Sequence, residues 1–300
     1  MIEKFQQALP HGITLSCRAA GKPGRPVLVF LHGFPEAAFV WDELLEHFAL
    51  PEHGGYRSVA PNLRGFEQSS APADVAAYRA KHLVQDIAAL IAIEAAGAPL
   101  ECLVAHDWGG AVAWNLANQQ PQLAKRLAII NSPHPGTFVR ELQSNPKQQQ
   151  ASAYMNFLIR PDAERLLAEN GYQRLFGFLT NGSDAAWLTD AVRKQYKRVW
   201  DAGLTGGCNY YRASPLRPQR AEDAGAAAIT LPHAMLTVSL PTLVLWAMDD
   251  IALPPELIDG LDAYVPNLTL EKVEGATHWI VHERPAFVAQ RLEAFLQKSR

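Results

Sequence analysis

The sequence has few cysteines and no long apolar run. Its three cysteines, Cys17, Cys102 and Cys208, are scattered singly with no CxxC pair, which argues against a disulfide framework and suits a reducing compartment. A membrane-spanning helix needs about 18 or more apolar residues, whereas the longest candidate runs cover only 26–31 and 87–93. Residues 1–7 carry charges with no apolar stretch behind them, so we expect no secretory signal and a cytoplasmic protein.

Charged side chains are also scarce. They make up 19% of the 300 residues, below the roughly 25% of an average soluble domain, while 48% are hydrophobic. This composition leaves room for a large core and excludes a disordered chain. The 27 basic and 30 acidic side chains are intermixed. Because no basic stripe stands out, we expect neither nucleic acid nor a membrane surface as a partner. The oligomeric state stays open, with a homodimer as one alternative.

Short apolar runs alternate with helical patterns along most of the chain. The valine-rich run 27–31 is typical of a strand buried on both faces. Further strand candidates and three helices of apolar periodicity complete the pattern: strands at 56–60, 102–105, 127–130, 243–246 and 268–273, and helices at 82–94, 109–119 and 285–296. This alternation predicts an α/β protein with a mostly parallel sheet flanked by helices.

The middle of the chain breaks this alternation. From about Pro135 to Pro232 there is no clear buried strand, and helical runs at 162–170 and 185–200 take its place. Strand candidates resume directly afterwards. We therefore predict a helical cap at 135–232, inserted between the first part of a core domain at 1–134 and its second part at 233–300.

The sharpest local motif is Val104–Gly110, which follows one strand candidate and opens a helix. Its small residues on both sides of Asp107 would let the strand and the helix approach closely. The motif is typical of a nucleophile elbow, with aspartate where serine usually stands. The start of the helix adds backbone N–H groups that favour an anion. The bland alternative is that Asp107 merely caps the helix.

A second motif, His32–Glu36, directly follows the strand candidate at 27–31. Its sequence, His-Gly-Phe-Pro-Glu, predicts a tight turn at the carboxyl ends of the strands, beside the elbow. Loops in this place supply a backbone N–H group to an oxyanion hole. His32 and His106, which lie within the two motifs, need not point the same way as Asp107. They are interpreted as structural residues or as residues that support the site indirectly.

Two later segments bring the polar side chains that a nucleophile needs. Asp249 and Asp250 end a strand candidate, and His278 follows the next one, which matches the chain order nucleophile, acid, histidine. Side-chain alternation at a strand end permits either aspartate. His278 and His282 are four residues apart, but without an HExxH motif or a third ligand we expect no metal site.

Together these motifs resemble the epoxide hydrolase branch of the α/β-hydrolase fold family over nearly the whole chain. The similarity lies in His32–Glu36, His106–Gly110 and Asn209–Arg212 (Asn-Tyr-Tyr-Arg). The resemblance implies an α/β-hydrolase fold and an enzyme that needs no cofactor and acts on a small-molecule epoxide and water.

The same resemblance assigns roles to individual residues. It implies that Asp107 is the nucleophile, that His278 activates water and that Asp250 orients the histidine. The backbone N–H groups of Phe34 and Trp108 would form the oxyanion hole. In the cap, Tyr211 would hold the epoxide oxygen together with a second tyrosine. Tyr154, in the segment 151–155, resembles that second one.

An aspartate nucleophile is chemically suited to displacement at a saturated carbon. Its carboxylate, with a reference pKa of about 3.9, is ionised at neutral pH and forms an alkyl ester that water can hydrolyse at the enzyme's own carbonyl. A serine would form an ether, which the same histidine could not cleave. The histidine is therefore needed in the second step, as a base toward water.

Carbon–halogen cleavage is the main alternative, because haloalkane and haloacid dehalogenases use the same nucleophile. Phe34 stands where many haloalkane dehalogenases carry a halide-binding asparagine. Fluoroacetate dehalogenases have arginines one and four positions after the nucleophile, where this chain has Trp108 and Ala111. With Tyr211, these differences favour an epoxide. A non-catalytic binding protein and a serine esterase are weaker alternatives, because the triad is complete and no GxSxG motif occurs.

Overall fold

The computed structural model describes residues 1–180 and 185–298. It contains an 8-stranded sheet in the order β1-β2-β4-β3-β5-β6-β7-β8. The strands are β1 (Glu3–Ala8), β2 (Thr14–Ala20), β3 (Val27–Leu31), β4 (Arg57–Pro61), β5 (Cys102–His106), β6 (Leu127–Ile130), β7 (Thr242–Ala247) and β8 (Leu268–Val273). β2 pairs antiparallel with β1 and β4, and the other neighbours are parallel. The predicted fold class is confirmed.

The centre of the sheet consists of the strands that were predicted as continuous apolar runs. Every residue of β3, β5 and β6 is buried. In the register, Val29 lies between Val59 of β4 and Leu103 of β5. Because all these strands are parallel, their carboxyl ends meet at one edge, where the motif residues follow them.

Two strands of the sheet, β1 and β2, were not predicted. β1 has no apolar run, since most of its residues are exposed or half-exposed at the edge of the sheet. β2 is buried but mixes Arg18 and Ser16 with small residues, and Arg18 forms an ion pair with Asp42 of α1 (Asp42–Ala49). Neither antiparallel strand therefore shows the continuous apolar run that identifies the parallel strands of the core.

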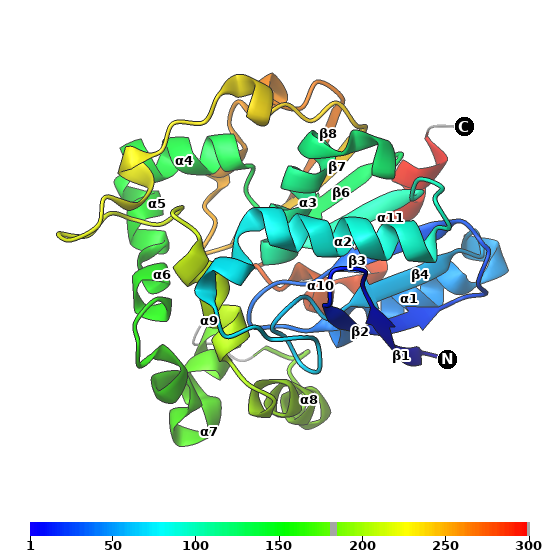
Figure 1. Ribbon diagram of the computed structural model, residues 1–300. Coiled ribbons are helices and arrows are strands. Elements are labelled where there is room, and N and C mark those ends of the chain that lie inside the picture. The colour runs from blue at the N-terminus through cyan, green and yellow to red at the C-terminus, as the bar shows by residue number, and fades with distance from the viewer. Residues whose placement is uncertain (181–184, 299–300) are drawn as a thin grey trace.

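Helices cover both faces of the sheet (Figure 1). α2 (Ala80–Glu94) and α3 (Asp107–Gln119) pack against each other on one face, and α1 (Asp42–Ala49) and α11 (Pro285–Gln297) pack on the other. The short α10 (Ile280–Glu283) precedes α11. Within the described residues, no helix combines the length and the apolar character needed to cross a membrane.

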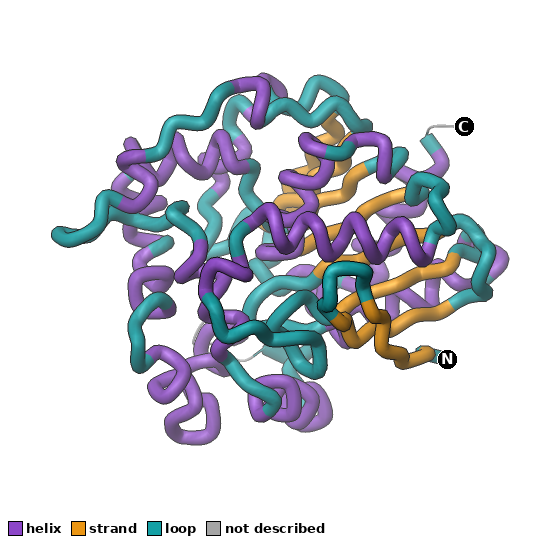
Figure 2. Tube along the Cα trace, viewed as in Figure 1, coloured by secondary structure: helices purple, strands orange, loops and turns teal. Residues whose placement is uncertain are grey.

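Between β6 and β7 the described residues form helices joined by loops, and none of them adds a strand to the sheet (Figure 2). This segment contains α4 (Pro135–Ser144), α5 (Pro146–Ala151), α6 (Ala153–Leu158), α7 (Ala163–Thr180), α8 (Asp190–Asp201) and α9 (Thr205–Ala213). Short 3-10 turns complete the chain: η1 (Ala38–Trp41), η2 (Pro51–His53), η3 (Val75–Tyr78), η4 (Pro121–Leu123), η5 (Gly225–Ala228), η6 (His233–Met235), η7 (Pro255–Ile258) and η8 (Leu261–Ala263). The division of the chain at 134 and 232 stays a prediction.

Two helices of this segment differ in extent from their predicted runs. α7 continues to Thr180, with a break in helical geometry from Glu169 to Tyr172. α8 begins at Asp190 instead of 185, because the Thr189 hydroxyl accepts a hydrogen bond from the backbone N–H of Val192 and caps the helix there. Neither difference moves the helices that carry Tyr154 and Tyr211.

Candidate active site

Asp107 occupies a sharp turn between β5 and α3. Its φ angle of 49° lies in the left-handed region, which a non-glycine residue rarely adopts. The small residues after it are required by the close approach of neighbouring chain segments. A Cβ atom on Gly109 would lie 2.5 Å from the carbonyl oxygen of Leu31, and one on Gly110 would lie 2.2 Å from Cβ of Ser132. The strained turn thus presents Asp107 at the edge of the sheet, as the elbow motif predicts.

The turn after β3 lies directly against this carboxylate. The backbone N–H of Phe34 donates a hydrogen bond of 2.7 Å to Oδ1 of Asp107. Gly33 makes the approach possible, since a Cβ atom there would lie only 2.3 Å from Cβ of Asp107. Trp108 follows in the first turn of α3, where backbone N–H groups have no partner within the helix. The Phe34 N–H is thus bonded to Asp107, and Trp108 directly follows Asp107 in the chain.

His278 lies between two carboxylates. Its Nδ1 is 2.6 Å from Oδ2 of Asp250, and its Nε2 is 3.7 Å from Oδ2 of Asp107. The side chain of Asp249 is exposed, whereas that of Asp250 is buried. The structure therefore brings Asp250, and not Asp249, to the histidine, which decides between the two residues that strand alternation left open.

Asp250 is held by further donors. The backbone N–H groups of Ala252 and Leu253 each donate to its Oδ1 at 2.9 Å. Asn131, which follows β6, donates from Nδ2 to Oδ2 at 2.8 Å and accepts from the N–H of Ala247 with its Oδ1. Asn131 was missed in the sequence, because a single asparagine after a strand carries no local signal of its partner.

The two carboxylates change the proton affinity of His278. Burial alone would lower the pKa of this imidazole, but the charge of Asp250, the hydrogen bond to it and the charge of Asp107 together raise the pKa to about 9. The pKa of Asp250 is lowered: burial opposes ionisation, but the charge and hydrogen bond of His278 outweigh it. At neutral pH the site therefore holds an imidazolium between two carboxylates.

Tyr154 on α6 and Tyr211 on α9 line the same cavity as Asp107. Their rings meet edge to face, with centroids 6.0 Å apart. The Tyr211 ring also packs edge-on against Phe34 and Trp108, at 5.3 and 5.1 Å. Burial, followed by the charge of Asp107, raises the pKa of Tyr154, and burial raises the pKa of Tyr211. Both phenols keep their protons at neutral pH and can donate them in hydrogen bonds.

The other three tyrosines of the helical segment have different partners. Tyr172 donates to Asp201 at 2.5 Å, and Tyr210 donates to the carbonyl oxygen of Arg64 at 3.0 Å. Tyr196 donates to Glu36 at 3.1 Å. The hydroxyl groups of these three tyrosines thus already donate hydrogen bonds to other residues of the protein.

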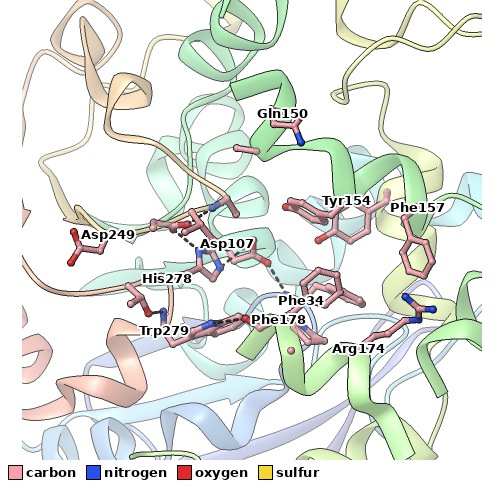
Figure 3. Close-up of a pocket in the computed structure, with 18 residues that line it drawn as sticks. Phe34, Asp107, Gln150, Tyr154, Phe157, Arg174, Phe178, Asp249, His278 and Trp279 are labelled. Atoms are coloured by element: carbon pink, nitrogen blue, oxygen red, sulfur yellow. Dashed lines mark hydrogen bonds and ion pairs between the residues drawn. The ribbon is translucent and has the colours of Figure 1, made fainter. Parts of the chain in front are cut away.

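The cavity has a volume of about 550 Å³ and is largely aromatic (Figure 3). Asp107 and His278 lie on one side of it, and Tyr154 faces them from the helical segment. Phe157, Phe178 and Trp279 contribute to the apolar lining, and the polar side chains of Gln150 and Arg174 also line the cavity. A cavity of this size and lining suits a small, mainly apolar substrate.

A buried polar network adjoins the site. The Glu36 carboxylate, 1% exposed, contacts His106 Nδ1 at 2.9 Å and both His282 Nε2 and the Tyr196 hydroxyl at 3.1 Å. His106 Nε2 is 2.9 Å from the carbonyl oxygen of His278. Burial alone would raise the pKa of Glu36, but hydrogen bonds from His106 and His282 hold it well below its usual range. The network ties α8 to the loop that carries Phe34.

The remaining histidines of the motifs have structural partners. His32 accepts a hydrogen bond from the N–H of Leu63 at 3.0 Å, and burial lowers its pKa to about 4, so its ring is neutral. The imidazole of His282 stacks on Trp187, with centroids 4.2 Å apart. His278 and His282 contact separate carboxylates, those of Asp250 and Glu36.

Comparisons with known proteins agree with this geometry. A family model described as alpha/beta hydrolase fold matches residues 26–285. The AB hydrolase superfamily protein YfhM of Bacillus subtilis is 34% identical over 297 residues, which cover 98% of each chain. Epoxide hydrolase 4 of Mus musculus is 30% identical over 296 residues, covering 96% of this chain and 77% of the relative. The crystal structure of a Bacillus megaterium epoxide hydrolase in complex with an inhibitor has a TM-score of 0.87 at 28% identity, covering 98% of this chain and 100% of that one.

The chain therefore belongs to the α/β-hydrolase fold family, the class that its sheet and its strand–turn–helix elbow define. Within this family it belongs to the epoxide hydrolase branch, and it is a hydrolase. The resemblance stated from the motifs is confirmed.

Proposed function

We propose that this protein opens epoxides to vicinal diols through a covalent ester between the substrate and Asp107. One observation carries the proposal: the Asp107 carboxylate lies between His278, 3.7 Å away, and two tyrosines that line the same cavity. The names of the relatives, epoxide hydrolase 4 and the Bacillus megaterium epoxide hydrolase, support the choice of substrate.

In the first half-reaction, a carboxylate oxygen of Asp107 attacks one ring carbon of the epoxide. A carbon–oxygen bond forms, and the bond from that carbon to the ring oxygen breaks with its electron pair. Tyr154 and Tyr211 donate hydrogen bonds to the ring oxygen from the opposite side, and one phenol proton is transferred to it. Because the Asp107 carboxylate is already ionised, this step needs no base.

In the second half-reaction, His278 takes a proton from water, and the resulting hydroxide attacks the ester carbonyl of Asp107. Ester formation removes the charge of Asp107, which is one of the interactions that raise the His278 pKa. The pKa of His278 therefore falls once the ester has formed. The imidazolium gives up its proton, which restores the phenol that protonated the ring oxygen, and the neutral imidazole becomes a base. Formation of the intermediate thus prepares the enzyme for its hydrolysis.

The oxyanion of this second step develops on an Asp107 oxygen. The N–H of Phe34 already donates to Oδ1 at 2.7 Å, and the N–H of Trp108 lies in the adjoining turn. The Phe34 N–H is in place before the charge appears, so it stabilises the charge without reorganisation, and we assign the Trp108 N–H the role of the second donor. Collapse of the tetrahedral intermediate releases the diol and restores the carboxylate.

We assign residues 135–232 the role of a cap over this site. Its helices α6 and α9 supply Tyr154 and Tyr211, while the core supplies the nucleophile, the acid and the histidine. The substrate then lies between the two parts of the chain, with its ring oxygen on the cap side.

The decisive experiment is a single turnover with excess enzyme in isotopically labelled water. The first diol should carry an unlabelled oxygen from the protein, and the label should then appear in the peptide that contains Asp107. Asp107→Ala should abolish diol formation while the far-UV circular dichroism spectrum stays unchanged. Label in the first-turnover diol would refute the covalent route.

A substrate panel tests the reaction class. Aryl and aliphatic epoxides, haloalkanes and fluoroacetate are assayed with one enzyme preparation, by diol formation and by halide release. Diol formation should dominate. Halide release exceeding diol formation would replace the proposal with a haloalkane or haloacid dehalogenase, which uses the same nucleophile.

A further inference from the structure

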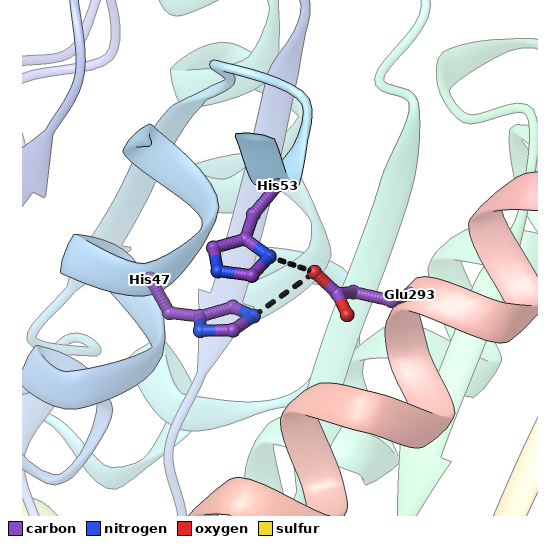
Figure 4. A group of neighbouring side chains, drawn as sticks. All are labelled: His47, His53 and Glu293. Atoms are coloured by element: carbon purple, nitrogen blue, oxygen red, sulfur yellow. Dashed lines mark hydrogen bonds and ion pairs between the residues drawn. The ribbon is translucent and has the colours of Figure 1, made fainter. Parts of the chain in front are cut away.

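A second group of chemically active side chains lies outside the cavity. His47 in the last turn of α1, His53 in η2 and Glu293 on α11 converge at the face of the sheet that α1 and α11 cover (Figure 4). None of the three lines the active-site cavity. They come from three separate segments, and Glu293 is 240 residues beyond His53.

The three side chains point toward one another. His47 Nε2 lies 3.1 Å from Glu293 Oε1, and His53 Nδ1 contacts the same oxygen. The two imidazole rings are stacked, with centroids 3.7 Å apart and planes 19° apart. All three ligand atoms lie within 4.8 Å of one another. The two ring nitrogens and one carboxylate oxygen thus already share a single small volume.

The electrostatic setting of Glu293 calls for positive charge. Its side chain is 25% exposed, and those of His47 and His53 are 28% and 30% exposed. Among residues 1–180 and 185–298, the ion-pair partners of this carboxylate are the two histidines, and no lysine or arginine pairs with it. A partly buried carboxylate is stabilised by a nearby positive charge, which a bound cation would supply.

We propose that His47, His53 and Glu293 bind a divalent transition-metal ion such as Zn²⁺. Two imidazole nitrogens and one carboxylate oxygen are ligands that Zn²⁺ prefers, and a water molecule completes a tetrahedral set. Ligand atoms around tetrahedral zinc are about 3.3 Å apart, so small side-chain rotations from the present arrangement suffice. Partial exposure of all three side chains leaves room for those rotations.

The bound ion would join α11 to α1 and η2. These segments lie at opposite ends of the chain, and α1 and α11 pack together on one face of the sheet. An ion that binds the folded chain and not the unfolded one stabilises the fold by mass action. The site is therefore a structural clamp, separate from the proposed epoxide chemistry and independent of it.

The test uses the full chain, freed of metal with a chelator and titrated with zinc chloride. Calorimetry should give one site per chain, and Zn²⁺ at 100 times its Kd should raise Tm by about 4 °C. Co²⁺ at the same site should give the visible absorption of a tetrahedral complex. Absence of binding up to about 1 mM Zn²⁺ would overturn the proposal.

Two variants separate a metal site from simple hydrogen bonding. Glu293→Gln keeps an oxygen that accepts from both imidazoles but loses the charge, and His53→Asn removes one ligand. Each should weaken Zn²⁺ binding at least about tenfold and leave diol formation unchanged. The control is His11→Gln, which removes the imidazole 2.7 Å from Asp86 and should bind Zn²⁺ like the wild type.

A measurement on the wild type keeps the test independent of how the variants fold. Zn²⁺ should protect His47 and His53, identified by peptide mapping, from diethyl pyrocarbonate, while His11 stays reactive. Unchanged Zn²⁺ affinity in both folded variants, or modification of His47 and His53 at the same rate with and without Zn²⁺, would contradict the assignment.

Discussion

The imidazole of His278 faces the carboxylate of Asp107 at 3.7 Å, within reach of its charge but beyond hydrogen-bond distance. The positive charge of the imidazolium therefore acts on the Asp107 oxygens, but no lone pair of these oxygens is used in a hydrogen bond to it. On its other side His278 is bound at 2.6 Å to Asp250. One ring can thus support the nucleophile as a cation and later serve as a base, and the predictions below test both states.

Replacing His278 should separate the two half-reactions. In His278→Gln, Asp107 is still ionised and still attacks the substrate, but water is no longer activated, so the alkyl ester should accumulate. Intact-mass spectrometry should show one adduct per chain. The matched control is His282→Gln, which lies one helical turn further and contacts Glu36 instead. An adduct in the control and none in His278→Gln would mean that the wrong histidine was assigned.

The two neighbouring aspartates should behave differently. Asp250→Asn removes the charge that holds the imidazolium, and ester hydrolysis should slow by roughly 100- to 10,000-fold. Asp249→Asn changes an exposed side chain and should leave the rate within about twofold. Stopped-flow measurement of ester decay compares the two variants directly. Equal losses would show that position 250 acts through local structure and not through His278.

The tyrosine pair should matter only while the ring opens. Each single change, Tyr154→Phe or Tyr211→Phe, should slow alkylation by about 10- to 1,000-fold, equivalent to about 1.4–4 kcal/mol, and the double change should nearly stop it. Ester hydrolysis, measured separately, should change little because the alkoxide already has its proton. Tyr172→Phe is the control, since its hydroxyl bonds Asp201. Rapid epoxide alkylation by the double variant would rule out this role.

Stability should depend on pH through His278. Its pKa is raised to about 9 in the folded protein, above about 6.5 in the unfolded chain, so the folded state binds the proton more tightly. The resulting stabilisation is fully present below pH about 6.5 and is lost as pH rises through about 9, with a total of about 3 kcal/mol at most.

The contribution is isolated by comparing wild type with His278→Gln in urea unfolding from pH 6 to 10, both without substrate. The difference in unfolding free energy between the two proteins should shrink as pH rises. A difference that is constant across this range would show that His278 is not protonated in the folded enzyme.

The elements that were predicted share one physical property. β3, β5 and β6 are buried on both faces of the sheet. Strands of this kind consist of apolar residues without interruption, and such runs are visible in the sequence. β1 lies at the edge of the sheet and needs no such run, and α8 starts where Thr189 caps it and not where the apolar pattern begins. Strand pairing at a sheet edge and helix capping, unlike burial on both faces, do not require a continuous apolar run in the sequence.

The candidate site divides in the same way. The Asp107 turn and the Gly33 loop are short segments whose backbone requires small residues at set positions. Their motifs can therefore be recognised in the sequence. The choice of Asp250 over Asp249 needed the structure, because two adjacent residues at a strand end differ only in which of them reaches His278. Tyr154 could be named from a resemblance, but its place in the cavity follows from how α6 packs.

The amino-acid sequence was thus sufficient for the α/β class, the buried strands of the core and the sharp turn that carries Asp107, because sterics and periodicity act over a few residues. Folding in three dimensions was needed to join Asn131 to Asp250 across 119 residues and His282 to Glu36 across 246. It also brought His47 and His53 to Glu293. Contacts between distant segments depend on how whole helices and strands pack, and no local pattern encodes the partner of a single polar side chain.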